Sequence, residues 1–453
     1  MDFNRFLFKH CVYHPATFLR GQNVLGTLKH LQQSQYWPSE RLRRHQVGRL
    51  NSLLQYAGEN VPYYRSCLSK GPKRLSSLKD ITTLPFLTKN ELRDAEGLMR
   101  ATRLPWLPVK KTTGGSTGQP LTILKSRESM ANELAATWRG YSWAGIDIGD
   151  RQARFWGVPL SHTGRRRAQL IDFICNRLRC SAFDFDDTSL ERYEQRLVRF
   201  RPTYFYGYVS MLTAFADYFV SKGRPSPFAP ELKCIITTSE VLTDAARHHL
   251  ETVFHARVFN EYGCGEVGTI AHECEHGSLH INEENLIVEV LNGDRPCQPG
   301  EMGELVVTEL NNTLMPLLRY RMGDFGSLGS APCKCGRNLA ILQHIHGRAY
   351  DFVVTPDGRR FHGEIIMYVF EEAKAQGMPL GQFQVIQRSI DDFLVKIVPA
   401  SGFDQKTHTA AIAKRMRQFL GEGITVDFEM CASISREQSG KMRVIVGLTS
   451  AHE

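Results

Sequence analysis

The glycine-rich stretch Lys111 to Pro120 carries residue types that bind phosphate groups in proteins. Its glycines allow a tight turn that brings backbone N–H groups close to an anion, and its Ser and Thr hydroxyls are further uncharged donors. It is not a Walker loop, because Gln119 and Pro120 follow Gly118, where that motif has Lys and then Ser or Thr. A cluster of this composition is often a plain surface loop, so its role depends on the rest of the chain.

Later motifs contain charged residues that suit a bound nucleotide. In chain order they are Tyr262 to Glu266, Tyr320 to Asp324, Gly347-Arg348 and Ser439 to Lys441. The first also contains the dinucleotide-binding pattern Gly263-x-Gly265-x-x-Gly268. We reject that interpretation, because Gly277 and Ser278 follow too soon for the long crossover helix that the pattern requires.

Cysteine and histidine residues form a second constellation. Cys274, His276 and His280 precede a predicted strand, and Cys333 and Cys335 lie on a loop rich in Gly and Pro. Two ligand pairs from two loops suit a closed tetrahedral zinc site. The alternative is a set of unpaired cysteines and surface histidines.

The elements that position these motifs alternate between helix and strand over the first half of the chain. Apolar spacing predicts helical structure from Val24 to about Ala57, and Thr88 with Glu91 forms a capping box. We predict further strands at 121–124, 153–158, 204–206 and 234–237, and helices at 127–144, 190–200, 210–222 and 243–254. This alternation indicates an α/β architecture.

Beyond Val258 the sequence pattern favours β-strands, which we predict at 286–291 and 303–308. After Gly347 the chain resembles a compact α+β module. Its predicted strands are 384–387, 394–398 and 425–429, and its predicted helices are 364–376 and 405–420. We therefore predict a large N-terminal domain, 1–347, with a helical segment at about 1–100 and α/β and β-rich parts at about 101–347, and a small C-terminal domain, 348–453.

Composition excludes several classes of protein. The 453 residues are 42% hydrophobic and 23% charged, with no apolar run long enough to span a bilayer. Met1 to Gln22 does not have the pattern of a signal peptide, and eleven irregularly placed cysteines indicate a reducing cytoplasm.

The net charge of +9 is distributed along the chain without a dense basic cluster, so we expect no nucleic-acid partner. Weak peripheral contact of Met1 to Arg20 with an anionic membrane stays open, as does the oligomeric state.

Taken together, the glycine-rich loop and the four later motifs resemble the adenylate-forming acyl ligase superfamily. The details look like the phenylacetate-CoA ligase family and its capsule-biosynthesis relatives, through Thr83 to Lys89, Phe205 to Ser210 and Met315 to Arg321. The resemblance spans nearly the whole chain. It implies a large adenylate-forming domain with a small, mobile C-terminal lid.

The resemblance also implies an activity. ATP and Mg²⁺ would activate a carboxylic acid as an acyl-adenylate with release of pyrophosphate, and the acyl group would pass to coenzyme A. One alternative is transfer to an amine or hydroxyl of a sugar or another small acceptor. A different alternative is a non-catalytic nucleotide-binding protein, against which Glu266 and Lys441 both argue.

The resemblance assigns roles to single residues. Lys441 would bridge the substrate carboxylate and the α-phosphate, Glu266 would bind Mg²⁺, and Asp324 would bind the ribose hydroxyls. Arg348 would lie at the ribose and the domain junction. The other expected nucleotide-binding residues are Thr113, Gly114, Gly115, Ser116, Thr117, Gly118, Ser239, Glu240, Glu261, Tyr262 and Gly263.

Three further expectations concern the acid, the metal and the hinge. Aromatic candidates for the acid pocket are Trp156, Tyr206 and Tyr208. Relatives imply that zinc would be held by Cys274, His280, Cys333 and Cys335, with His276 as the alternative histidine. The acidic hinge residue that the family has two positions after the Arg is here Tyr350, so the hinge would shift to Asp351.

Overall fold

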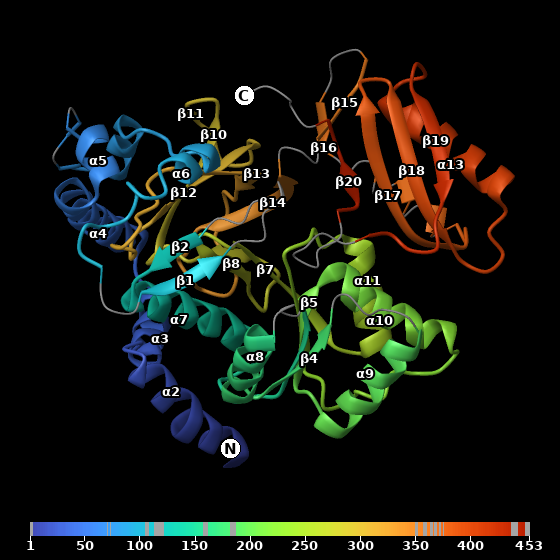
Figure 1. The fold of residues 1–453 in the computed structure, drawn as a ribbon, viewed down its shortest axis with the longest axis horizontal. Helices are drawn as coiled ribbons and strands as arrows, with labels where there is room; N and C mark the ends of the chain where they lie inside the picture. Colours follow the sequence, from blue (N-terminus) through green and yellow to red (C-terminus); the bar gives the residue numbers. More distant parts are fainter. Residues whose placement is uncertain are drawn as a thin grey trace. The chain divides into compact units, whose positions relative to one another are not determined.

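The computed structural model describes residues 3–69, 71–72, 74–104, 108–112, 122–156, 162–181, 187–348, 352–356, 360–362, 366, 369–370, 373–374, 376–435 and 443–448 (Figure 1). Contacts between residues divide the chain into two compact units. The first comprises Met1–Met322 and Gly326–Ile345, and the second comprises Gly323–Phe325 and His346–Glu453.

The largest sheet has 12 strands in the order β11-β10-β12-β13-β14-β9-β8-β7-β6-β5-β3-β4. Strands β3 to β7 pair in parallel, whereas β7, β8 and β9 pair antiparallel, so the parallel and antiparallel parts meet at β7. The strands are β3 (Gln152–Trp156), β4 (Arg177–Ser181), β5 (Tyr204–Tyr208), β6 (Cys234–Thr238), β7 (Arg257–Cys264), β8 (Gly268–Glu273), β9 (Leu279–Ile281), β10 (Leu286–Asn292), β11 (Arg295–Pro296), β12 (Gly303–Glu309), β13 (Tyr320–Leu328) and β14 (Ile341–Arg348). A separate hairpin consists of β1 (Val109–Thr112) and β2 (Thr122–Lys125).

Helices supply most of the N-terminal segment and the connections between parallel strands. They are α1 (Phe3–Leu7), the π-helical turn η1 (Phe8–Tyr13), α2 (His14–Leu19), α3 (Val24–Ser34), α4 (Ser39–Asn60), α5 (Pro62–Cys67), the 3₁₀ turn η2 (Leu78–Thr83), α6 (Lys89–Asp94), α7 (Arg127–Trp143), α8 (His162–Ile174), α9 (Asp187–Phe200), α10 (Val209–Ser221) and α11 (Asp244–Phe254). Among the described residues, none of the helices is both long and apolar enough to cross a membrane.

The predicted helical run from Val24 to Ala57 is divided into two helices. Pro38 is the N-cap of α4, with φ −55° and ψ 143°. Its ring disfavours a helical conformation of Trp37 and it has no N–H to donate, so a continuous helix is interrupted here. The predicted capping box is confirmed: Thr88 N–H donates to Glu91 Oε2 at 2.7 Å, and Glu91 N–H donates to Thr88 Oγ1 at 3.2 Å.

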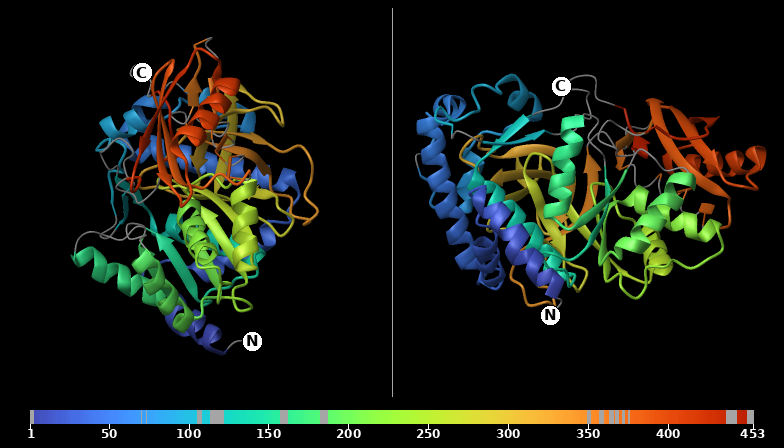
Figure 2. Two further views of the ribbon diagram at one scale, coloured as in Figure 1. Left: turned by 90° about the vertical axis from the view of Figure 1, so that its right-hand side faces the viewer. Right: turned by 60° about the horizontal axis from the view of Figure 1, so that its bottom comes forward.

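Helices cover both faces of the parallel strands (Figures 1 and 2). On one face, Phe155 and Phe205 pack with residues of α9, α10 and α11. On the other, Tyr204, Tyr206 and Ile236 pack with residues of α3 and α7. Strand side chains alternate between the two faces, which explains why these strands read as continuous apolar runs in the sequence.

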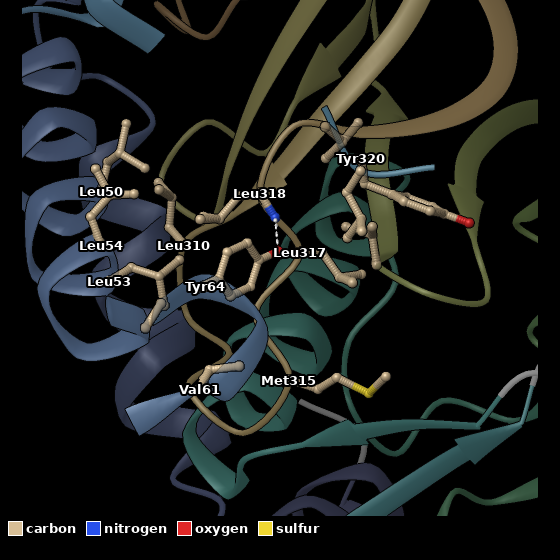
Figure 3. Close-up of a cluster of buried hydrophobic side chains, with 14 of the residues drawn as sticks. Leu50, Leu53, Leu54, Val61, Tyr64, Leu310, Met315, Leu317, Leu318 and Tyr320 are labelled. Carbon is tan, nitrogen blue, oxygen red and sulfur yellow. Dashed lines mark hydrogen bonds between the residues drawn. The ribbon is translucent and has the colours of Figure 1, made fainter. Parts of the chain in front are cut away.

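A further core joins α4 and α5 to the strands around β12 and β13 (Figure 3). Leu50, Leu53 and Leu54 of α4 pack in the same cluster as Leu310 and Leu317. The Tyr64 hydroxyl donates to the Pro316 carbonyl at 2.9 Å and accepts from the Leu318 N–H at 3.3 Å. Each buried leucine contributes about 1.5–3 kcal/mol. This core fixes the segment that leads into β13.

The second unit contains a four-stranded sheet in the order β19-β18-β17-β20 and the helix α13 (Gln405–Leu420). Its strands are β17 (Leu380–Ser389), β18 (Asp392–Pro399), β19 (Thr425–Met430) and β20 (Ile445–Val446), and β15 (Phe352–Val354) pairs with β16 (Arg360–His362). The predicted helix 364–376 lies only partly within the described residues. The predicted α/β fold with a large N-terminal and a smaller C-terminal part is confirmed.

Candidate active site

The carboxyl ends of three parallel strands carry several of the predicted nucleotide-binding residues. Strands β5, β6 and β7 are neighbours, and Thr238 is in register with Glu261. Ser239 and Glu240 follow β6 directly, while Tyr262 and Gly263 lie near the end of β7. Carboxyl ends of adjacent parallel strands meet at one edge of a sheet, which is where open α/β sheets bind ligands.

Ser239 and Glu240 form a sharp turn at this edge. Ser239 has φ +69°, a left-handed conformation that is uncommon for a residue other than glycine and that clusters at functional sites. The Glu240 carboxylate accepts hydrogen bonds from Ser210 N–H at 2.6 Å and from Ser210 Oγ at 2.9 Å. The Glu240 side chain therefore binds the first turn of α10.

The β7–β8 hairpin carries Glu266 in its turn. The register shifts between Tyr262 and Gly263, and a Cβ atom at Gly263 would lie 2.3 Å from the Gly268 carbonyl oxygen, so only glycine fits. Glu266 is buried, with Tyr320 Oη 3.5 Å from its Oε1. Because strand β8 follows this turn, the structure agrees with our rejection of the dinucleotide pattern.

Thr113, Gly114, Gly115, Ser116, Thr117 and Gly118 lie outside the described residues, but both strands that flank them are described. Lys111 of β1 is in register with Ile123 of β2, and Lys111 Nζ donates to Glu133 Oε1 of α7 at 2.6 Å. Burial lowers the pKa of Lys111, but the adjacent Glu133 outweighs burial and raises it.

Glu133 links this hairpin to the strand that follows Glu266. A Cβ atom at Gly268 would lie 2.4 Å from Glu133 Cδ, so the carboxylate packs directly on the Gly268 backbone. Gly268 also has φ +100°, which favours glycine. Glu133 Oε2 is buried and makes no hydrogen bond within the described part of the chain. Glu133 thereby brings the base of the glycine-rich loop next to the Glu266 hairpin.

The second strand of the hairpin is held by a buried ion pair. Lys125 Nζ lies 2.6 Å from Glu309 Oε2, and Ser129 Oγ donates to Glu309 Oε1 at 2.5 Å. Lys125 is fully buried, and its Nζ is 4.0 Å from Glu133 Oε2. Removing one partner of such a pair costs about 3–5 kcal/mol, because a charge is left buried without compensation.

The two family motifs around Phe86 and Arg319 pack on each other. Leu87 N–H donates to the Arg319 carbonyl at 3.1 Å, and the guanidinium groups of Arg319 and Arg321 each lie 4.0 Å from the centre of the Phe86 ring. Arg319 also forms a bidentate pair with Glu289, at 2.8 and 3.0 Å. These contacts fix the start of β13, four residues before Asp324.

The remaining expected catalytic residues are described only in part. Asp324 lies within β13 and is 9% exposed. Arg348 ends β14, and its side chain lies outside the described parts. Lys441 and the expected hinge residues Tyr350 and Asp351 also lie outside the described residues.

The aromatic candidates for the acid pocket lie together. The Trp156 ring centre is 4.3 Å from that of Tyr208 and 5.7 Å from that of Tyr206. The Tyr206 hydroxyl donates to Glu261 Oε1 at 2.9 Å. Burial raises the pKa of Glu261 to about 7, against the lowering effects of Tyr206 and of Arg154.

Cys274, His280, Cys333 and Cys335 converge, with ligand atoms that all lie within 4.8 Å of one another. Cys274 Sγ is 3.6 Å from Cys333 Sγ, and Cys335 Sγ is 3.2 Å from His280 Nε2. Tetrahedral zinc with Zn–S bonds of about 2.3 Å places its sulfur ligands about 3.8 Å apart, so the residues fit the metal. His276 instead directs its backbone N–H to Cys274 Sγ at 3.4 Å.

The surroundings of this cluster also suit a metal. His280 Nδ1 lies 3.0 Å from the Leu339 carbonyl, and donation there leaves Nε2 free to bind a metal. Cys335 N–H donates to Cys333 Sγ at 3.5 Å. Leu42, Trp143 and Leu339 pack around the cysteines as a small apolar shell.

Sequence reasoning missed Glu133, Lys125, Glu309 and Arg154. Glu133 and Lys125 look like ordinary exposed residues of a helix and a strand, and Glu309 is 184 positions from Lys125. Arg154 did offer a signal, because it is a charged residue inside the otherwise buried strand β3.

Comparisons with known proteins identify the class of enzyme. Residues 112–315 match the model of the AMP-binding enzyme family, and residues 353–447 match that of the CapK C-terminal domain. The fold and the site thus define an adenylate-forming enzyme. A phenylacetate-coenzyme A ligase of Thermus thermophilus is 26% identical over 91% of this chain and 97% of its own length. Protein CapK of Staphylococcus aureus is 24% identical over 88% of this chain and 87% of its own length.

These matches support an adenylate-forming, phenylacetate-CoA ligase-like family for this chain and an AMP-forming acid ligase activity. A solved structure of 2-hydroxyisobutyryl-CoA ligase in the postadenylation state has the same fold. It superposes with a TM-score of 0.74 at 20% identity, covering 91% of each chain.

Proposed function

We propose that this protein uses ATP to convert a carboxylic acid to an acyl-adenylate, with release of pyrophosphate, and then transfers the acyl group to coenzyme A. The observation that supports this most is the position of Glu133, which binds Lys111 at the base of the glycine-rich loop and packs on Gly268 beside the Glu266 turn. The supports of two expected nucleotide-binding motifs are thereby joined near the carboxyl end of β7, and open α/β sheets bind ligands at such an edge.

The proposed roles follow from where charge develops during adenylation. The carboxylate attacks the α-phosphate and pyrophosphate leaves, so donors are needed at the phosphates. The N–H and hydroxyl groups of residues 113–118 would hold the leaving pyrophosphate. Lys441 would neutralise the carboxylate and α-phosphate, delivered by a mobile C-terminal domain that turns about Asp351.

The remaining nucleotide contacts follow the same logic. Asp324 would accept hydrogen bonds from the ribose hydroxyls, with Arg348 nearby, and Ser239, Glu240 and Tyr262 would border the adenine. Glu266 carries a buried carboxylate in the β7–β8 turn, and carboxylate oxygens are ligands that Mg²⁺ accepts. Bound Mg²⁺ would reduce the charge of the phosphates that the loop holds.

We propose zinc as a structural ion at Cys274, His280, Cys333 and Cys335, on the geometry given above. The ion would tie the loop before β9 to the loop around Cys333, which contribute little core of their own. We further propose a cytoplasmic location, supported by eleven free cysteines. Weak membrane contact of the N-terminal segment is a secondary proposal, supported by Phe18 and Leu19, which are 62% and 85% exposed.

A second acceptor class has its own support. The C-terminal part matches the CapK domain, which favours transfer to an amine or hydroxyl of a sugar or another small molecule as the alternative to coenzyme A. The deciding experiment is ATP–pyrophosphate exchange with a panel of aryl, fatty, hydroxy and amino acids. Mass spectrometry of the products with and without coenzyme A then identifies the acceptor. A panel in which no acid supports exchange would favour a non-catalytic nucleotide-binding protein.

A further inference from the structure

Arg154 packs against two rings of the aromatic cluster and forms no ion pair with any described residue. Arg154 is the middle residue of β3, and its guanidinium lies 4.6 Å from the centre of the Trp156 ring and 4.8 Å from that of Tyr206. Its Nε is buried and makes no hydrogen bond to any described residue. The side chain as a whole is half-buried, so part of the guanidinium remains accessible.

A second polar atom without a partner lies beside it. Glu261 is 6% exposed, and its Oε1 accepts from the Tyr206 hydroxyl at 2.9 Å. Its Oε2 is buried and makes no hydrogen bond of normal geometry within the described residues, although the Tyr141 and Thr238 hydroxyls lie near enough to lower the pKa of the carboxyl. Tyr206 therefore contacts both groups, with its ring against Arg154 and its hydroxyl on Glu261. Buried polar atoms are almost always hydrogen-bonded. Two that lack partners, on side chains that contact the same tyrosine, therefore indicate a place where a polar group of a ligand binds.

The local charge favours an anion. Arg177 and Arg179, the arginines nearest to Arg154, both pair with Asp172. Burial lowers the pKa of Arg154, and the neighbouring Arg177 and Arg179 lower it further, so an anion beside Arg154 would relieve both effects. An uncompensated buried charge destabilises the protein by more than two cation–π contacts stabilise it.

Strand register places this charge away from the nucleotide. Arg154 is in register with Tyr206 of β5, and Tyr208 is in register with Thr238 of β6, next to Ser239. Arg154 therefore lies two strand residues from the level of Tyr208 at the carboxyl edge, a distance of about 7 Å at about 3.3 Å per residue. An acid whose reacting carboxyl lies at that edge would direct the far end of its acyl group towards Arg154.

We infer that Arg154 is a specificity residue for an acid that carries a second carboxylate at the far end of its acyl group. Arg154 N–H groups would bind that carboxylate, with Glu261 beside it. This inference rests on the proposed function. A hydroxyl or an uncharged end group would be recognised differently, because neither would compensate the charge of Arg154.

The test combines substrate preference with stability. ATP–pyrophosphate exchange is measured with α,ω-dicarboxylates from succinate to suberate and with the ω-hydroxy and unsubstituted acids of the same chain length. We expect one or more dicarboxylates to exceed both matched acids by at least about 10-fold in kcat/KM, a difference of about 1.4 kcal/mol. Arg154→Met should abolish that ratio, and Arg154→Lys should restore part of it.

The Tm of the ligand-free protein distinguishes a role of Arg154 in substrate recognition from a structural role. Arg154→Met should raise the Tm of the ligand-free protein, because it removes an uncompensated charge and keeps most of the volume. Arg139→Met is the matched control: this buried arginine binds Glu284 at 2.6 Å and Asn282 at 2.7 Å, so its loss should lower Tm.

Three results would overturn the inference. They are a wild-type preference for the uncharged or hydroxy acids, an unchanged ratio in Arg154→Met, and a fall in Tm of Arg154→Met like that of Arg139→Met. Failure of the proposed function has a different signature, since no acid of any class would then support exchange.

Discussion

Lys111 Nζ lies 2.6 Å from Glu133 Oε1, and this contact ties the strand that enters the glycine-rich loop to helix α7. Glu133 also packs on Gly268, in the strand that follows Glu266. One carboxylate therefore touches the supports of two motifs that are more than a hundred positions apart in the chain.

Glu133→Gln should reduce catalysis more than stability. The amide keeps the packing against Gly268 but loses the charge that holds Lys111, so the loop base becomes less well positioned. We expect kcat/KM for ATP–pyrophosphate exchange to fall about 10-fold, which corresponds to about 1.4 kcal/mol. Glu128→Gln on the same helix is the control, because its pair with Arg49 is exposed and should be worth under about 1 kcal/mol. Equal activity of the two variants would contradict a positioning role for Glu133.

Gly268→Ala should disrupt the same contact from the other side. The new methyl group would collide with Glu133 Cδ at 2.4 Å, and the backbone has φ +100°. We expect both unfolding stability and exchange activity to fall. Gly293→Ala separates strain from collision, since Gly293 also has positive φ, +61°, but has open space around its would-be Cβ. Gly268→Ala should be the more destabilised variant in urea unfolding, and equal midpoints would argue against the collision.

The zinc proposal predicts metal content and stability together. Purified protein should contain about one zinc per chain, and a strong chelator should lower its Tm. Cys335→Ser should lose the metal, whereas Cys431→Ser should retain it, because Cys431 lies outside the cluster. Elemental analysis of wild type and both variants checks this. Full zinc content in Cys335→Ser would place the metal elsewhere.

Glu261 should make stability depend on pH. Burial raises its pKa from the ordinary 4.5 to about 7, so the folded state keeps the proton more tightly than the unfolded state. This contribution is fully present below about pH 4.5 and is lost as pH rises towards 7, a change on the order of 3 kcal/mol. The stability of wild type relative to Glu261→Gln should therefore fall between pH 5 and 7. Glu283, also raised to about 7 by burial, is present in both proteins and cancels in the difference.

The check is urea unfolding of wild type and Glu261→Gln at several pH values across this range. Parallel stability curves would show that Glu261 titrates at its ordinary pKa in the folded protein.

Local patterns predicted much of the fold. The helix at 405–420 and the capping box at Thr88 were read from spacing and side-chain type, which act over a few residues. The break at Pro38 was missed, because apolar spacing continues on both sides of it. The joining of parallel and antiparallel strands into one sheet was also missed, since strand order depends on contacts between distant segments.

The same distinction between local and long-range features applies to the candidate site. Motifs such as Tyr262 to Glu266 are contiguous and can be recognised from sequence, whereas their supports are not contiguous. The partners of Lys125 and Arg319 lie on strands far from them in the chain, at Glu309 and Glu289. The family resemblance already favoured His280 over His276 as a zinc ligand, and the fold brings His280 together with the three cysteines.

The most direct test of the proposed function is carboxylate-dependent ATP–pyrophosphate exchange by wild type and Lys441→Ala. Lys441 is proposed to neutralise the charge that builds up between the carboxylate and the α-phosphate, so its removal should reduce exchange by about 100-fold or more. Wild type should show exchange only when a suitable acid is present. Undiminished exchange in Lys441→Ala would contradict the account.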